Sequence, residues 1–178
     1  KIGDQLRIPA YIRRVIQDED TKNFSGQLWF PPKFDWQNDH FDISKQGDLF
    51  IYEAHVGMAQ EKEGIGTYNE FTENILPRIK KAGYNAVQLM AIQEHPYYGS
   101  FGYHVSSFYA PSSRFGTPED LKMLIKTAHD MGIAVIMDLV HSHTVKNLNE
   151  GLNLFDGSET QYFHAGARGE HPNRDSKL

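Results

Sequence analysis

Acidic and imidazole side chains gather in one short stretch of the sequence. Asp138, His141 and His143 directly follow a short apolar run, residues 133–137, which Gly132 opens. Such a run is typical of a strand buried on both faces. In parallel α/β folds, side chains just beyond the carboxyl ends of strands line the ligand site. We therefore expect Asp138 to belong to a binding or catalytic site, as an acid, a base, a metal ligand or an orienting group.

The two histidines leave a metal site open as an alternative. His141 and His143 share one face of an extended segment, and Asp138 supplies a third ligand of the kind that zinc accepts. A metal-dependent α/β hydrolase is thus an alternative, but histidines in solvated loops are commoner than metal ligands. The sequence has no cysteine, which excludes disulfides, thiolate metal sites and cysteine nucleophiles. It has no Gly-x-Ser-x-Gly motif either, so a serine hydrolase lacks its nucleophile.

A second group of candidate residues is the aromatic, glycine-rich stretch from Glu94 to His104. Its tyrosines, Tyr103 among them, suit stacking on the apolar face of a sugar ring. The alternative is that these rings pack beneath the sheet. Glu53 and His55 end an earlier strand, where they could be buried, hydrogen-bonded support instead.

The elements that must position these residues begin at Asp48. Apolar runs at 49–55, 86–90 and 133–137 predict three strands, and helical spacing of apolar residues fills the two intervals. Pro77 predicts a break in the first helix. Thr117-Pro118 predicts the start of the second helix, with Gly132 just past its end. Two consecutive strand–helix–strand units predict a parallel sheet, and the pattern fits both an open doubly wound sheet and a (β/α)₈ barrel. Three strands cannot close a barrel, so the α/β part reads as truncated.

Residues 1–47 have a different character. Short extended runs at 10–16 and 26–30 suggest strands, and residues 33–47 read as a polar linker. Two or three strands cannot bury a core, so we expect this segment to be the end of a β-sandwich domain. The predicted domain division is 1–47 and 48–178.

Composition limits the class of partner and the location. The 178 residues carry a formal net charge of −5, so the sequence lacks the excess of basic residues that nucleic-acid binding needs. The hydrophobic fraction of 39% is ordinary for a globular protein. No apolar run is long enough to span a membrane, and no signal peptide is visible at the amino end. We expect a cytoplasmic protein with neither nucleic acid nor membrane as a partner.

Several motifs resemble one family. Residues 138–143 resemble the third-strand signature of the α-amylase family, with the His-Ser-His of its branching enzymes. Further stretches match that group in order along the chain: 51–57, 88–95, 101–105, 112–121, 151–157 and 175–178. The sequence is therefore similar to an internal fragment of the 1,4-α-glucan branching enzymes, in their eukaryotic-like form.

The resemblance implies a fold, a reaction and roles for residues. The fold would be the first part, about three β/α units, of a (β/α)₈ barrel, preceded by the end of a carbohydrate-binding-like β-sandwich. The reaction would be cleavage of an α-1,4 glucan (amylose or glycogen) and transfer of the segment to a 6-hydroxyl, by a retaining mechanism without a cofactor. Tyr103 would stack on the bound sugar, His143 would hydrogen-bond its hydroxyls, and Asp138 would orient groups from the fourth strand.

The resemblance also implies what this stretch does not contain. The family's nucleophile and acid lie on later strands, so we expect no catalytic residue and no metal ligand within residues 1–178, and no branching activity from this chain alone. Two alternatives stay open, a non-catalytic glucan-binding module and the metal-dependent hydrolase. Exposed strand edges predict self-association.

Overall fold

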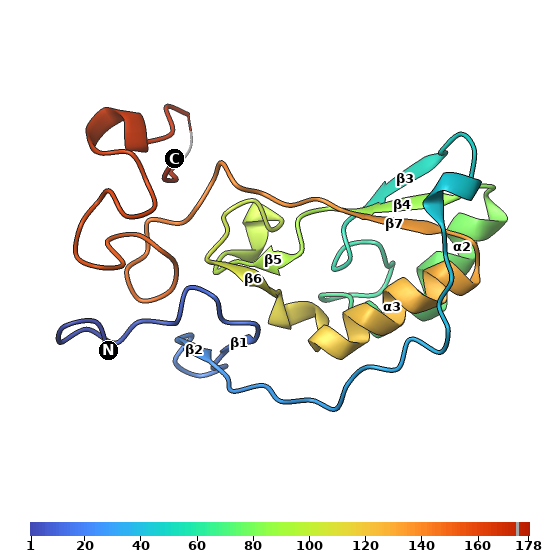
Figure 1. Ribbon diagram of the computed structural model, residues 1–178, viewed down its shortest axis with the longest axis horizontal. Helices are drawn as coiled ribbons and strands as arrows, with labels where there is room; N and C mark the ends of the chain where they lie inside the picture. Colours follow the sequence, from blue (N-terminus) through green and yellow to red (C-terminus); the bar gives the residue numbers. More distant parts are fainter. Residues whose placement is uncertain (174) are drawn as a thin grey trace. The chain divides into compact units, whose positions relative to one another are not determined.

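The computed structural model describes residues 1–173 and 175–178. Its contacts divide the chain into two compact units, each assembled from separate segments (Figure 1). Unit 1 comprises Lys1–Trp29, Gln93–Ser113 and Leu139–Leu178, and unit 2 comprises Phe30–Ile92 and Arg114–Asp138.

Unit 2 holds a three-stranded parallel sheet in the order β3-β4-β7. Its strands and helices are β3 (Ile51–Ala54), α1 (Tyr68–Glu70), η2 (Phe71–Ile75), α2 (Leu76–Lys81), β4 (Ala86–Leu89), α3 (Pro118–Asp130) and β7 (Ala134–Met137), with the short turn η1 (Ile43–Lys45). The strands pair without offset, Ala86 opposite both Ile51 and Ala134. In Figure 1, α2 and α3 lie on the same side of the sheet. The predicted strand–helix–strand rhythm is thus confirmed.

Pro77 interrupts the first helix as predicted. The helix begins at α1 under a capping box in which Thr67 and Glu70 bond reciprocally, widens into a π-helical turn at η2, and resumes as α2. Proline lacks the N–H that would bond one turn back, and its ring crowds that carbonyl, so the helix accommodates it by widening.

Helix α3 begins and ends as the sequence predicts. The Thr117 hydroxyl accepts from the Asp120 backbone nitrogen, the Asp120 carboxylate accepts from the Thr117 nitrogen at 2.7 Å, and Pro118 occupies the first turn. The helix ends at Asp130 with Met131 as its C-cap, and Gly132 follows with φ of +69°, a left-handed conformation that suits glycine. The apolar face of α3 packs into the core of unit 2. That core includes Tyr68, Phe71, Leu76, Ile79, Val87, Leu89, Phe115, Leu124 and Ile133.

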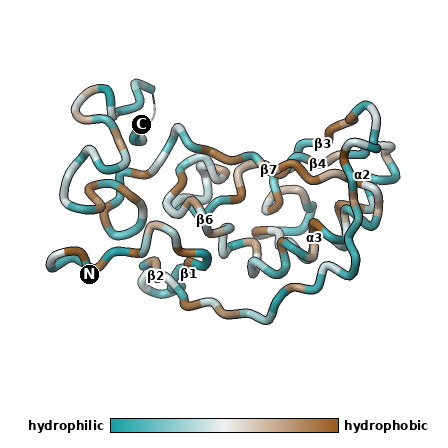
Figure 2. Tube along the Cα trace, in the orientation of Figure 1, coloured by the Kyte–Doolittle hydropathy of each residue, from teal (hydrophilic) through white to brown (hydrophobic). Residues whose placement is uncertain are grey.

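The prediction that the third strand is buried on both faces is wrong. Figure 2 shows apolar residues running along β4 and β7, yet only the central strand β4 is largely buried. Met137 is 44% exposed and Ile51, on β3, is 45% exposed. The reason is topological, because β3 and β7 each pair with β4 alone among the described strands.

Unit 1 contains two antiparallel strand pairs. These are β1 (Val15–Gln17) with β2 (Phe24–Gly26) and β5 (Gln93–Glu94) with β6 (Ser107–Pro111), accompanied by the turns η3 (Tyr98–Ser100) and η5 (Gly166–Gly169). The strand extents predicted at 10–16 and 26–30 are wrong, since pairing is confined to three residues on each side. The hairpin β5–β6 was not predicted, because residues 107–111 lack an alternating pattern. The β-sandwich and the domain division at 47/48 stay predictions.

None of the helices that the structure describes has the length and apolar character needed to cross a bilayer.

Candidate functional site

Tyr103 ends a tightly turned loop between β5 and β6. Its backbone nitrogen donates to the Ser100 carbonyl at 3.0 Å, and the turn reverses through Phe101 and Gly102, both at positive φ. The Ser100 hydroxyl donates to the Tyr97 carbonyl at 2.7 Å. Tyr103 is half-buried, whereas Tyr97 in the same loop is 66% exposed. The hydrogen bonds therefore restrain the loop while Tyr103 stays partly accessible.

His143 lies on the segment that pairs with the Tyr103 loop. The Val105 nitrogen donates to the His143 carbonyl at 3.3 Å, and the Val145 nitrogen donates to the Val105 carbonyl at 3.1 Å. The Thr144 hydroxyl donates to the same Val105 carbonyl at 2.8 Å. Since Val105 is two residues beyond Tyr103, this bridge brings two of the three predicted sugar-binding residues onto neighbouring backbone segments of unit 1.

Residues 171–177 also contact the segment that carries His143. Thr144 and Lys177 exchange backbone hydrogen bonds of 3.3 and 2.9 Å, and the ring of His171 packs edge-on against that of His143, with centroids 4.7 Å apart. The sequence predicts no role for His171. It lies about thirty residues away in sequence, and nothing in its local pattern indicates this contact.

An ion-pair cluster of Lys146, Glu170, Asp175 and Lys177 fixes this chain end. Lys146 Nζ lies 2.6 Å from Glu170 and 2.9 Å from Asp175, while Lys177 Nζ lies 2.6 Å from Glu170. The hydrogen bond with Glu170 is the main cause that raises the pKa of Lys146. The hydrogen bond from Lys146, followed by that from Lys177, lowers the pKa of Glu170. Both shifts keep the pair charged near neutral pH.

Asp138 belongs to unit 2, directly after β7. Its backbone nitrogen donates to the Leu89 carbonyl at 3.0 Å, which extends the β4–β7 pairing by one residue, and its side chain is half-buried. This is the expected position just past a strand's carboxyl end. Tyr103 and His143 both belong to unit 1, whereas Asp138 belongs to unit 2. Of the three predicted sugar-binding residues, the structure therefore brings two into one unit.

The described residues do not form the ligand cluster that a metal site at Asp138, His141 and His143 requires. His141 is exposed and its ring stacks nearly parallel to Phe108, at 6.3 Å between centroids, while His143 packs against His171. Within residues 1–173 and 175–178, no three His, Cys, Asp or Glu side chains lie close enough together to hold a metal ion.

Glu94 and Gln93 are buried support for the Tyr103 loop, a role that the sequence did not reveal. The Glu94 carboxylate accepts from the Ser113 nitrogen at 2.8 Å and the Ser112 hydroxyl at 3.3 Å. The backbone carbonyl of Glu94 accepts from the Ser106 nitrogen at 2.8 Å. The one available signal was a pair of polar residues that follows a buried strand after three intervening residues, which favours either a site or its support.

The first strand ends in one exposed and one buried polar residue. Glu53 is exposed, so the expectation of a buried support is wrong for that residue, whereas His55 is buried. The His55 ring meets Phe115 edge-on at 5.5 Å, and burial lowers the pKa of its imidazole. A buried imidazole of lowered pKa is neutral at pH 7, so it acts here as packing rather than as a charge.

Comparisons with known proteins agree with this architecture. The family model described as "Alpha amylase, catalytic domain" matches residues 34–176. A 1,4-alpha-glucan-branching enzyme from Yarrowia lipolytica is 56% identical over 97% of this chain, and one from Saccharomyces cerevisiae is 55% identical over 97%. The chain spans about a quarter of the length of these curated relatives.

The fold has a solved counterpart as well. A putative alpha amylase from Salmonella typhimurium superposes with a TM-score of 0.61 at 23% identity, over 78% of this chain and 26% of that one. At that identity the likeness concerns the fold, which is the α/β fold of an amylase catalytic domain. The family of the chain is decided by the family model, which matches most of the sequence. The chain belongs to the alpha-amylase family.

Proposed function

We propose that this chain is part of a 1,4-α-glucan branching enzyme, which cuts an α-1,4 glucan and transfers the segment to a 6-hydroxyl. The observation that carries the proposal is the 56% identity, over 97% of the chain, to a protein of that name. A relative in Arabidopsis thaliana, named 1,4-alpha-glucan-branching enzyme 2-2, chloroplastic/amyloplastic, is 52% identical over 99% of the chain. Because the chain spans only part of each relative, the activity is proposed for the larger enzyme.

The proposal includes the architecture around the described elements. The parallel order β3-β4-β7, with a helix in each crossover, supports the first three β/α units of a (β/α)₈ barrel. The antiparallel pair β1–β2 in residues 1–47 supports the end of a carbohydrate-binding-like β-sandwich. A cytoplasmic location is part of the same proposal and rests on sequence features alone.

The proposed roles in the reaction are those of substrate binding. Tyr103 offers a half-exposed ring for the apolar face of a glucose unit, and His143 offers imidazole nitrogens for its hydroxyls. Asp138 would orient groups contributed by later strands. Retaining transglycosylation needs a carboxylate nucleophile and a second carboxyl as acid and base. We assign neither to this chain, because the family resemblance places both on later strands; the buried Glu94 carboxylate is engaged by Ser112 and Ser113.

A binding experiment with maltoheptaose tests these roles. We expect Tyr103→Ala and His143→Ala each to weaken binding about tenfold, which corresponds to about 1.4 kcal/mol. The matched controls are Tyr97→Ala, an exposed tyrosine of the same loop, and His141→Ala, an exposed histidine of the same segment. Controls that lose as much affinity as the test variants would contradict the assignment.

The chain alone should not branch amylose. Purified chain incubated with amylose is expected to leave the α-1,6 linkage signal in the proton NMR spectrum at background. New α-1,6 linkages would place the chemistry within residues 1–178 and make Glu53, Glu94 and Asp138 the carboxylates to replace. A glucan-binding module would also give no linkages, and exchanging this chain into a branching enzyme of the same family separates the two possibilities.

A further inference from the structure

Unit 1 brings two exposed tyrosines from distant parts of the sequence into ring contact. The ring centroids of Tyr11 and Tyr109 lie 5.1 Å apart, and the ring planes are tilted by 46°. This distance is typical of contacting aromatic pairs. Tyr11 is 72% exposed and Tyr109 is 60% exposed, so both phenols are open to reagents in solution.

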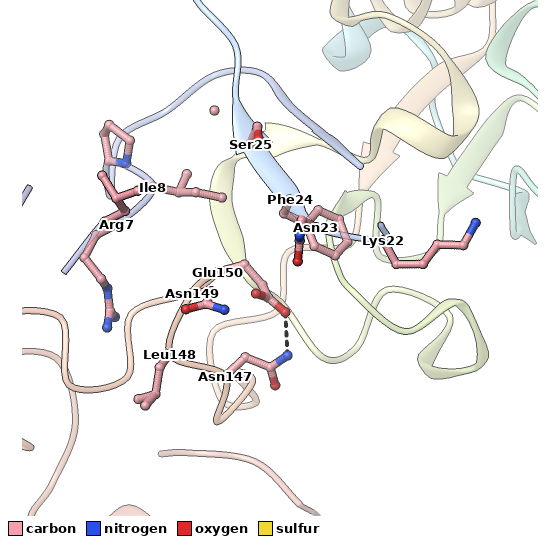
Figure 3. A pocket seen from close by; sticks show the side chains of 13 residues that line it. Arg7, Ile8, Lys22, Asn23, Phe24, Ser25, Asn147, Leu148, Asn149 and Glu150 are labelled. Carbon is pink, nitrogen blue, oxygen red and sulfur yellow. Dashed lines mark hydrogen bonds between the residues drawn. The ribbon is translucent and has the colours of Figure 1, made fainter. Parts of the chain in front are cut away.

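The segment that carries Tyr11 is anchored on both sides of that residue. Before it, Arg7 Nη2 donates to the Asn153 carbonyl at 2.6 Å. Figure 3 shows Arg7 and Leu148 in the lining of one pocket, so the amino-terminal segment and the loop before Asn153 lie together here. After it, strand β1 pairs with β2. The position of Tyr11 within unit 1 is therefore restricted.

Tyr109 is held by the strand in which it lies. β6 pairs with β5, and the carbonyl of the preceding residue, Phe108, accepts from Gln93 Nε2 at 3.0 Å. Both rings thus belong to restrained backbone segments. Restraint of this kind raises the effective concentration of one ring at the other, which favours a reaction within the chain over a reaction between two chains.

Tyr162 lies near the pair but is a poorer candidate for oxidation. It is 38% exposed, and its ring packs edge-on against Phe155 at 5.8 Å between centroids. Burial is the main cause that raises the pKa of Tyr162, and Tyr11, Asp156 and Tyr109 add to the shift. Since a phenol that holds its proton more firmly is oxidised less readily, Tyr11 and Tyr109 are the more reactive members of the group.

A second tyrosine pair, in unit 2, provides a comparison. Tyr52 and Tyr84 have ring centroids 5.2 Å apart, but their planes meet edge-on at 69°, and Tyr52 is only 39% exposed. Two phenol rings joined by one carbon–carbon bond adopt a twist between parallel and perpendicular. The 46° tilt of Tyr11 and Tyr109 is nearer to that arrangement.

We propose that Tyr11 and Tyr109 form an oxidative cross-linking site, at which a haem peroxidase with hydrogen peroxide joins the two rings. Each phenol loses one electron and one proton and becomes a phenoxyl radical, whose unpaired electron is shared with the ring carbons beside the oxygen. The two radicals couple through one such carbon each. The hydrogen on each joined carbon then moves to the oxygen, which restores both aromatic rings. One hydrogen peroxide takes up the two electrons and two protons and becomes two waters.

The product, a dityrosine, would tie the amino-terminal segment to β6. The link spans about one hundred residues of sequence and restricts the unfolded chain in the way that a disulfide does. The sequence has no cysteine, so a disulfide cannot supply this restraint. The site is independent of the function proposed above.

Peroxidase treatment of the purified chain tests the proposal. The dilute chain is treated with a haem peroxidase and hydrogen peroxide, and tandem mass spectrometry of tryptic peptides locates the joined residues. Trypsin cuts after Arg7 and Arg13, so the peptide 8–13 contains Tyr11 as its one tyrosine. We expect this peptide to be joined to Tyr109, in a chain that keeps its monomeric mass on a denaturing gel.

Four variants that keep the ring and remove the phenol sharpen the test. Tyr11→Phe and Tyr109→Phe should each lose most of the dityrosine fluorescence. The matched controls are Tyr97→Phe, which alters a 66% exposed tyrosine of the same unit, and Tyr52→Phe, which alters the unit 2 pair. Both controls should retain the fluorescence of the parent chain. Circular dichroism establishes that each variant is folded.

The remaining outcomes would overturn the site. They are an absence of dityrosine, dityrosine that joins Tyr52 to Tyr84, cross-links found only between separate chains, and full fluorescence in Tyr11→Phe. The peptide map of the parent chain decides among them even where a variant fails to fold.

Discussion

The side-chain oxygen of Gln93 accepts a hydrogen bond of 2.9 Å from the backbone nitrogen of Val140. The nitrogen of the same amide donates to the Phe108 carbonyl at 3.0 Å. One buried side chain therefore joins the start of the Tyr103 loop to β6 and to the segment that leads into His143. Both proposed sugar-binding segments of unit 1 depend on this amide for their spacing.

Replacing Gln93 should destabilise the chain. In Gln93→Leu, the buried Val140 nitrogen and the partly buried Phe108 carbonyl lose their partners, so we expect a loss of about 2–4 kcal/mol in the free energy of unfolding. Urea denaturation followed by circular dichroism measures it. The control is Gln161→Leu at an exposed position. A Gln93→Leu variant as stable as that control would contradict the role of the amide.

Removing the cap of α3 should cost less. The Thr117 hydroxyl accepts from the Asp120 nitrogen at 3.1 Å, and Thr117→Ala leaves that donor without its partner. We expect a loss of about 1 kcal/mol, the usual effect of an N-cap removal. Thr127→Ala, inside the same helix, controls for the change in side chain. If both variants unfold at the same urea concentration, the capping box does not contribute as described.

The pair Asp39 and His129 should make stability depend on acid pH. Asp39 Oδ2 lies 2.6 Å from His129 Nδ1, and Phe41 stacks on the imidazole at 4.3 Å. The hydrogen bond from His129, followed by that from the Phe41 nitrogen, lowers the pKa of Asp39, and Lys126 adds to the shift. Because this pKa is lower in the folded chain, the stabilisation is present above the unfolded pKa of about 4 and is lost as the pH falls through the folded value.

The substitution Asp39→Asn tests this dependence. The urea midpoint of the parent chain should fall more steeply than that of Asp39→Asn as the pH is lowered from about 5 to about 2. Asp48→Asn, an exposed aspartate in the same unit, should retain the parent's slope. Parallel curves for the parent and Asp39→Asn would show that the pair does not couple protonation to folding.

The edges of the parallel sheet should make the chain associate with itself. β3 and β7 each pair on one side only among the described strands, and Phe50 and Ile51 are 63% and 45% exposed. Unpaired strand edges with apolar side chains promote association. Light scattering should give a mass that rises with concentration, and Ile51→Lys should suppress the rise. Ile43→Lys, an exposed isoleucine outside the sheet, should not. A concentration-independent monomer mass would contradict this prediction.

Local rules predicted the elements whose signals lie within a few residues. Pro77 marked the helix interruption, Thr117 and Pro118 marked the start of α3, and Gly132 marked the turn into β7, because each acts through its own backbone. Long-range contacts were not predictable in this way. Gln93 meets Val140, and His143 meets His171, across intervals that no local pattern spans.

Burial was misjudged for a related reason. An apolar run such as 133–137 indicates a strand that can be buried on both faces, but its exposure depends on which neighbours the topology supplies. The edge position of β7 leaves Met137 exposed although its residue type favours the interior. Position along the chain identified Asp138 as a strand-end residue, while the roles of Tyr103 and His143 came from the family resemblance.

A segment exchange tests the central claim most directly. This chain would replace the matching quarter of the Yarrowia lipolytica 1,4-alpha-glucan-branching enzyme, to which it is 56% identical. The account predicts that the chimera forms α-1,6 branches in amylose and that His143→Ala in the chimera removes most of this activity, whereas His141→Ala does not. A folded chimera that binds amylose without forming branches would contradict the assignment to a branching enzyme.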